Sequence, residues 1–273
     1  MIFLIKDNRR ELTLKHKIAM IQLDIHYGDT QTNYTRASTF IDKAVKSGAD
    51  IILLPELWTS GYDLTRLDEI ADDQAKESIA FLQEQAKKYN VSLVGGSVAE
   101  KCDDGVRNTL LVVDSKGKLV HKYSKLHLFQ LMDEHVYLEE GNDKTEFELD
   151  GTDSAGFICY DIRFPEWMRK SALNDAKVMY VVAEWPKLRI DHWRILLQAR
   201  AIENQCYVIA CNRSGSDPKN EFGGMSLIID PWGEVVAEGG LEEEIVIGEV
   251  DFSLVEEVRK RIPVFGDRRE ERY

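Results

Sequence analysis

Short runs of apolar residues alternate along the chain with longer segments in which apolar residues recur every three or four positions. Short β-branched runs are typical of buried strands, and the longer periodic segments are typical of amphipathic helices. In the first half, this pattern predicts strands at 17–23, 50–54 and 91–97, with helices at 32–46 and 73–89 between them. A β-α-β-α-β order predicts a parallel sheet covered by helices.

An antiparallel pair of strands follows this unit. Strands are predicted at 109–114 and 119–123, on either side of the sequence SKGK at 115–118, which is typical of a hairpin turn. The second half repeats the same order in a looser form. Its expected elements are strands at 154–159, 178–183 and 207–211, helices at 165–174 and 190–204, a hairpin of 225–230 with 235–237, a strand at 244–250 and a helix at 253–261. Two such halves predict two sheets packed face to face with helices outside, a four-layer α-β-β-α sandwich.

No linker separates the two halves, so we expect residues 16–273 to form one domain. Residues 1–15 are expected to be an N-terminal extension ahead of the first core strand. Its apolar start is interrupted by charges from Lys6 onward, which is not typical of a secretory signal. Because no window of about 18 apolar residues occurs, a membrane span is not expected.

The composition is ordinary for a soluble globular protein, with 44% hydrophobic and 30% charged residues. A formal net charge of -13 argues against a nucleic-acid partner, because phosphate binding needs clustered Lys and Arg. The four cysteines show no CxxC pair and no His spacing suited to zinc, so no metal site is expected. Free thiols without a secretory signal predict a cytoplasmic protein.

Cys159 is the first candidate for chemistry. It ends an apolar strand and precedes a helix that Pro165 and Glu166 are expected to open. A thiol near a helix N-terminus is expected to favour the thiolate form, because the helix dipole is positive there. Taken alone, a buried intracellular cysteine more often packs as a small hydrophobe.

Glu56 and Lys125 are the other two candidates. Glu56 follows a buried strand and Pro55 and is flanked by large apolar residues, so desolvation is expected to raise its pKa toward neutrality. Lys125 lies in an apolar segment directly after a strand. Taken alone, each would more often be a solvated strand-end charge. All three candidates, however, follow the carboxyl ends of predicted strands, where open α/β sheets bind their ligands.

Three segments in this order carry a resemblance to a known family. The segments LPELW (54–58), SKLHLF (124–129) and ICYDIRFPE (158–166) resemble the motifs of the nitrilase, or carbon-nitrogen hydrolase, superfamily. The resemblance implies a triad in which Glu56 is the general base and acid, Lys125 stabilises the oxyanion and Cys159 is the nucleophile. It also implies a second glutamate before Gly141, for which Glu134 is the best match and Glu139 and Glu140 are competitors.

The resemblance implies a reaction that needs no metal or organic cofactor. Cys159 would attack the carbonyl of a small-molecule amide and form a thioester, with release of ammonia. Glu56 would then activate water, while Lys125 and the backbone N–H of Tyr160 hold the developing negative oxygen.

The segment AEWP (183–186) and the helix after it are similar to the bacterial ω-amidase branch, whose members act on 2-oxoglutaramate or 2-oxosuccinamate. Trp185 and Tyr62 are candidates to line the acyl pocket, although both would also serve as packing aromatics. Arg163 or Arg189 would suit a carboxylate, unless Arg163 pairs with Asp161 instead. An N-carbamoyl amine hydrolase, a nitrilase and a non-catalytic binding module of the same fold remain as alternatives.

The family resemblance also implies a homodimer that pairs through helices flanking the active-site strands. Trp167, Met168 and Trp193 are apolar residues on the two helices after Cys159. They would suit such an interface if exposed, and the hydrophobic core if buried.

Overall fold

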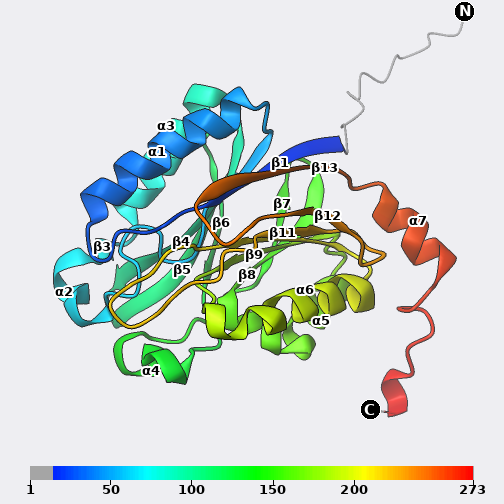
Figure 1. Cartoon of the computed structure of the whole chain (residues 1–273). Coiled ribbons are helices and arrows are strands. Elements are labelled where there is room, and N and C mark those ends of the chain that lie inside the picture. The colour runs from blue at the N-terminus through cyan, green and yellow to red at the C-terminus, as the bar shows by residue number, and fades with distance from the viewer. Residues whose placement is uncertain (1–14, 273) are drawn as a thin grey trace, which may run out of the picture.

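Two mixed β-sheets pack face to face and carry helices on their outer sides (Figure 1). The computed structural model describes residues 15–272 of the chain. Helices α1 (Thr30–Lys46) and α3 (Lys76–Tyr89) cover one side, and α5 (Pro165–Leu173) and α6 (Ile190–Asn204) cover the other. The predicted four-layer α-β-β-α sandwich is therefore confirmed.

The first sheet has the strand order β13-β1-β2-β4-β5-β6, with β3 paired to β4. Its strands are β1 (Lys15–Gln22), β2 (Ile51–Leu53), β3 (Asp72–Asp73), β4 (Ser92–Cys102), β5 (Gly105–Val113), β6 (Leu119–Ser124) and β13 (Glu244–Asp251). Strands β1, β2 and β4 run parallel, whereas β5, β6 and β13 add antiparallel pairs. The short helix α2 (Leu67–Ile70) precedes β3.

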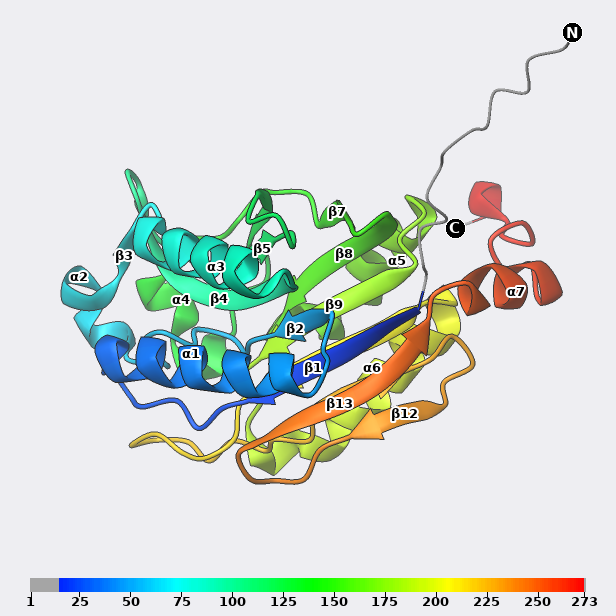
Figure 2. The ribbon, with the colours of Figure 1, turned by 90° about the horizontal axis from the view of Figure 1, so that it is seen from above.

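The second sheet has the strand order β12-β11-β10-β9-β8-β7. Its strands are β7 (Glu146–Leu149), β8 (Thr152–Ile158), β9 (Val178–Ala183), β10 (Tyr207–Asn212), β11 (Leu227–Ile229) and β12 (Val235–Glu238). Strands β8, β9 and β10 are parallel, so their carboxyl ends lie at one edge. The short helix α4 (Glu134–Tyr137) precedes β7. Figure 2 shows α7 (Leu254–Arg261) projecting beyond the end of β13, with the C-terminal segment after it.

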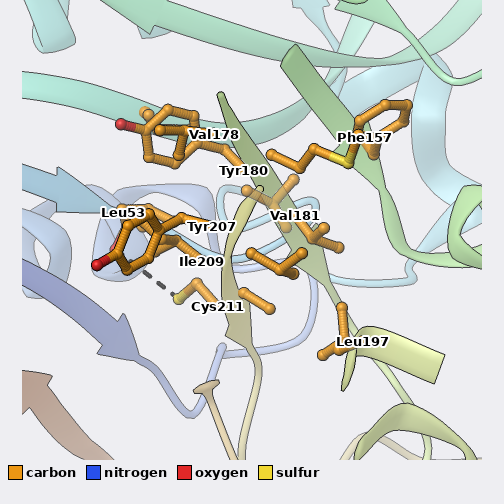
Figure 3. Packing of buried hydrophobic residues seen from close by; sticks show 14 of the residues in the cluster. Leu53, Phe157, Val178, Tyr180, Val181, Leu197, Tyr207, Ile209 and Cys211 are labelled. Carbon is orange, nitrogen blue, oxygen red and sulfur yellow. Dashed lines mark hydrogen bonds between the residues drawn. The ribbon is translucent and has the colours of Figure 1, made fainter. Parts of the chain in front are cut away.

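Alternation along the strands divides the hydrophobic core into layers. Ile18 and Met20 of β1 face the second sheet, whereas Ala19 and Ile21 face α1 and α3. Between the sheets, the Cys211 thiol lies 3.8 Å from the Leu53 carbonyl oxygen (Figure 3). Strands β2, β9 and β10 are buried throughout, and β8 is buried except at Asp153. The residues that follow these strands are therefore held in fixed positions.

The predicted elements differ from the structure mainly at their ends. Helix α1 starts two residues earlier than predicted, because Asp29 caps it by accepting a hydrogen bond from the Thr32 N–H at 3.1 Å. Strand β11 starts later, because Met225 adopts a left-handed conformation with φ 52°. Strands β3 and β7 were not predicted.

The three apolar residues considered for a subunit interface are not exposed in the structure. Met168 and Trp193 are fully buried and belong to the core between α5, α6 and the second sheet, and Trp167 is half-buried against it. The expected extension, residues 1–15, lies outside the described residues except for Lys15, which already belongs to β1. Among residues 15–272, no helix has the length and apolar character needed to cross a membrane.

Candidate active site

Four of the predicted site residues form one buried cluster at the strand ends. Glu56 follows β2, Lys125 follows β6 directly, Cys159 follows β8 directly, and Glu134 is the first residue of α4. Glu56, Lys125 and Glu134 have no exposed surface, and Cys159 is 4% exposed. Residues more than 100 positions apart in the chain are thus brought together by the meeting of the two sheets.

Lys125 bridges the two glutamates. Its Nζ lies 2.8 Å from Glu56 Oε1 and 2.6 Å from Glu134 Oε1. Burial alone would lower the pKa of Lys125, but the Glu134 and Glu56 carboxylates raise it above its ordinary value. The group therefore remains an ammonium ion. An ammonium ion has three N–H donors, so one is left after the two glutamates are bound.

Glu134 connects Lys125 to the wall of the site. Its Oε1 accepts hydrogen bonds from Lys125 and from the Tyr62 hydroxyl, and its Oε2 accepts one from the Phe129 N–H at 2.7 Å. Burial raises the pKa of Glu134, while Lys125 opposes that rise. The competing residues Glu139 and Glu140 are both exposed.

The two carboxylate oxygens of Glu56 accept different numbers of hydrogen bonds. Oε1 accepts hydrogen bonds from Lys125 at 2.8 Å, from Asn108 Nδ2 at 2.8 Å and from the Tyr62 hydroxyl at 3.2 Å. Among residues 15–272, one hydrogen bond reaches Oε2, from the Glu184 N–H at 2.8 Å. Because a carboxylate offers about two lone pairs on each oxygen, Oε2 is the atom with capacity to take a further proton.

Cys159 sits at a strained turn that a buried carboxylate stabilises. Its φ of 44° is left-handed and is uncommon for a residue with a side chain. Asp161, two positions later, accepts hydrogen bonds from the Ile158 N–H at 3.0 Å and the Tyr123 hydroxyl at 2.8 Å, and contacts His127 Nδ1 at 2.7 Å. The turn is therefore tied to both β6 and the segment that carries Lys125.

The expected preference of Cys159 for the thiolate form is not what the surroundings favour. Burial raises the pKa of the Cys159 thiol well above its ordinary value, and Glu56 raises it further, while Lys125 lowers it. The sequence indicated the helix that follows but not the complete burial or the two nearby carboxylates. Glu56 raises the pKa of the thiol more than any other charged group does, so its carboxylate is the candidate to accept the thiol proton.

A narrow cavity opens beside the thiol. Its lining residues are Phe129, Cys159, Tyr160, Arg163, Trp185, Pro186 and Arg189. Trp185, a candidate for the acyl pocket, and Tyr160, a candidate oxyanion donor, both border this cavity. Tyr62 does not line this cavity, because its hydroxyl points to the two glutamates.

Two guanidinium groups stand at this cavity. Arg163 lies over the Trp185 ring, 4.8 Å from its centroid, and Arg189 lies over the Phe129 ring at 5.5 Å. The suggested ion pair between Arg163 and Asp161 is not formed, because Asp161 is fully occupied by other donors. Arg163 instead contacts His192 Nδ1 at 3.3 Å. Both guanidinium groups are half-buried, which is suited to binding an anionic part of a ligand.

Sequence reasoning missed three residues that contact the cluster or support it: Asn108 on Glu56, and the fully buried ion pair of Glu184 with Arg213. Tyr62 was a candidate for the acyl pocket, but its hydroxyl contacts the two glutamates instead. Burial raises the pKa of Glu184, and Arg213 opposes that rise. One signal was available, because Glu184 and Arg213 are charged residues placed directly after strands that are buried throughout.

Comparisons with known proteins agree with this geometry. The sequence pattern of the family described as "Carbon-nitrogen hydrolase" matches residues 17–260. The chain is 53% identical over 260 residues to a 2-oxoglutaramate amidase of Bacillus subtilis, covering 95% of this chain and 100% of that relative. It is 36% identical to the omega-amidase YafV of Escherichia coli K12, covering 92% and 96%. The crystal structure of Saccharomyces cerevisiae Nit3, a nitrilase-superfamily member, matches with a TM-score of 0.86 and 31% identity over 93% of this chain and 97% of that one.

Proposed function

Since this chain belongs to the carbon-nitrogen hydrolase family and is an amidase, we propose that it is an ω-amidase that releases ammonia from the terminal amide of 2-oxoglutaramate or 2-oxosuccinamate. One observation carries the catalytic part of the proposal: Lys125 is hydrogen-bonded to both Glu56 and Glu134 beside a buried thiol. The similarity to a 2-oxoglutaramate amidase and to other ω-amidases supports the substrate class.

In the proposed acylation step, the Cys159 sulfur attacks the amide carbonyl carbon and its proton passes to Glu56 Oε2. The negative oxygen that develops is stabilised by the third N–H of Lys125 and the backbone N–H of Tyr160. The C–N bond then breaks, and Glu56 returns the proton to the departing nitrogen, which leaves as ammonia. A thioester between substrate and Cys159 remains.

Water completes the proposed cycle. Glu56 takes a proton from a water molecule, whose oxygen attacks the thioester carbonyl carbon. The C–S bond breaks, the thiol recovers its proton from Glu56, and the acid product leaves. Glu134 does not exchange protons in this scheme. Its role is to orient Lys125, and at the same time it holds the backbone of Phe129.

The carboxylate end of the substrate is proposed to bind Arg163 and Arg189. Both guanidinium groups border the cavity that Cys159 lines, and each lies over an aromatic ring. A guanidinium group forms paired hydrogen bonds with a carboxylate, which fixes the distance between that end and the amide. Trp185 and Phe129 would pack against the aliphatic part between them.

Wild-type protein is expected to release ammonia rapidly from the two oxo-acid amides, and slowly or not at all from glutamine, a carbamoyl amino acid and a simple nitrile. Arg163→Met is expected to raise KM for the oxo-acid amides by roughly tenfold or more, because a charged hydrogen bond is lost. A neutral amide of the same length is the matched control, since its KM should change little. Equal KM increases for charged and neutral amides would argue against carboxylate binding at Arg163. Turnover of the carbamoyl compound alone would instead identify an N-carbamoyl amine hydrolase.

The protein is also proposed to be a homodimer that pairs through α5 and α6. Leu173, Ile195 and Ile202 are exposed on these helices by 38%, 64% and 53%, and the last two lie seven residues apart on one face of α6. A second copy would cover this face. Sedimentation velocity at micromolar concentration is expected to give a dimer, and Ile195→Glu is expected to give a monomer; a wild-type monomer would contradict the proposal.

A cytoplasmic location is proposed as well. Cys102, Cys159, Cys206 and Cys211 are all unpaired, as expected for a protein of a reducing compartment, and the proposed reaction requires Cys159 as a free thiol.

A further inference from the structure

Glu184 and Arg213 form a fully buried ion pair that the reaction described above does not use. Arg213 Nη1 lies 2.6 Å from Glu184 Oε2, and neither side chain has exposed surface. Each residue directly follows a strand of the second sheet, Glu184 after β9 and Arg213 after β10. The two strands are parallel neighbours, so the sheet register places the two side chains together.

The pair is poorly explained as a stabilising feature. Removing two charges from water is costly, and the attraction between them compensates only when all remaining polar atoms are hydrogen-bonded. Within residues 15–272, Glu184 Oε1 and Arg213 Nε are buried and have no hydrogen-bond partner. Two apolar side chains of similar size would fill the same space without that cost.

Arg213 is held rigidly from several sides. Its Nη2 donates to the Ile25 carbonyl oxygen at 2.7 Å and to that of Ser216 at 3.0 Å, and its guanidinium carbon lies 4.2 Å from the centroid of the Phe222 ring. Its backbone N–H donates to the Ala183 carbonyl oxygen at 2.9 Å. Arg213 is therefore a fixed anchor for whatever its Nη1 binds.

Glu184 transmits this fixed position to Glu56. Its side chain is bound to Arg213, and its backbone N–H is, within the described part of the chain, the one donor to Glu56 Oε2. That oxygen is the one with capacity to take the thiol proton. A small displacement of the Glu184 backbone would therefore leave Oε2 free to turn away from the thiol, although Oε1 would keep its three donors.

We propose that Glu184 and Arg213 are positioning residues that hold the end of β9 so that the Glu184 N–H keeps Glu56 Oε2 directed at the Cys159 thiol. This inference rests on the proposed role of Glu56 as the base. The pair acts on Glu56 through the Glu184 backbone N–H, and among the described residues its two side chains make no hydrogen bond to Glu56 or Cys159. It therefore affects the rate of proton transfer and not the binding of the substrate.

The test replaces both members of the pair. In Glu184→Met/Arg213→Met the backbone N–H of residue 184 remains, and no unpaired charge is left behind. We expect kcat for 2-oxoglutaramate to fall by tenfold or more, KM to stay within about twofold, and the melting temperature to stay the same or rise. Alkylation of Cys159 by iodoacetamide at pH 7, mapped by mass spectrometry, should slow by a similar factor, because it too depends on Glu56.

The matched control is an ion pair at the opposite end of the same strand. Lys177 precedes β9, and its Nζ lies 2.7 Å from Glu256 Oε1 on α7. Lys177→Met/Glu256→Gln is expected to leave kcat and the alkylation rate of Cys159 unchanged. If the Met pair at 184 and 213 does not fold, Glu184→Gln/Arg213→Leu provides the same comparison.

A folded double variant with wild-type kcat and wild-type alkylation rate would overturn the positioning role. A parallel loss of kcat and of melting temperature, with KM raised, would overturn it as well, because it would indicate a structural role only. If the wild-type protein itself fails on every amide while its Cys159 is alkylated faster than that of the double variant, the proposed function fails and the positioning role stands.

Discussion

Cys159→Ala is expected to abolish ammonia release, by a factor of at least about 10⁴, and to leave the protein folded. The loss follows because no other group can form the thioester, so only polarisation of the amide by Lys125 remains. The fold should persist, because the change removes a single sulfur atom from a residue that is 4% exposed and keeps the backbone turn. Ammonia release and the melting temperature measure the two expectations separately.

Cys206→Ala is the matched control for this change. Cys206 is also a free, fully buried thiol, and it packs in the core between the second sheet and the helices. Its replacement removes a similar packing contribution without touching the cluster, so it should retain wild-type activity. Hydrolysis by Cys159→Ala above the trace level would exclude Cys159 as the nucleophile.

Lys125→Met should lower kcat by about 10² to 10³ and also destabilise the fold. The activity falls because an oxyanion donor is lost. Stability falls because Glu56 and Glu134 are left as two buried carboxylates without their shared cation, a change of about 3–5 kcal/mol in the free energy of unfolding. Urea unfolding at neutral pH together with initial rates measures both effects.

The pH dependence of this destabilisation has a definite sign. Burial already raises the pKa of Glu134 in the wild type, and removal of Lys125 removes the charge that opposes the rise. A carboxyl with a raised pKa in the folded state binds more protons there than when unfolded, so stability is lost as pH rises through the interval above the ordinary Glu value. The stability deficit of Lys125→Met should therefore shrink as pH is lowered toward about 5.

A second variant separates the two roles of Lys125. Lys125→Met/Glu134→Gln has one negative charge fewer in the cluster, so it should recover part of the stability without recovering kcat. An unchanged kcat in Lys125→Met, or a stability deficit that does not depend on pH, would contradict the bridging role inferred from the two hydrogen bonds of Lys125.

The layers of the fold and the main site residues could be predicted because they depend on local patterns. Strand β9 and helix α6 have the predicted bounds, since apolar periodicity extends over the whole of each. Glu56, Lys125 and Cys159 stand out because each is a polar residue that follows a predicted strand and has large apolar neighbours. The segments that identify these three site residues, 54–58, 124–129 and 158–166, are each short and continuous in the sequence.

The remaining contacts depend on sheet register, which the sequence does not specify. Asn108 is 52 residues from Glu56 and reaches it only because β5 lies next to β4 and β4 next to β2. The Tyr62 hydroxyl points to Glu134, 72 residues away, and not to the acyl pocket. The raised pKa of Cys159 has the same origin, since the burial and the two carboxylates that cause it come from other segments of the chain.

Glu134 constrains how this enzyme could acquire new substrates. One of its oxygens orients Lys125, and the other binds the backbone of Phe129, a residue of the pocket wall. Mutations that reshape the pocket by moving the Phe129 backbone would therefore also misalign Lys125. Arg189 has no such link in the described part of the chain, where its side chain lies over the Phe129 ring and forms no ion pair. Evolutionary divergence and laboratory selection for other amides should accordingly begin at Arg189, where a change of specificity does not require a compensating change in the catalytic cluster.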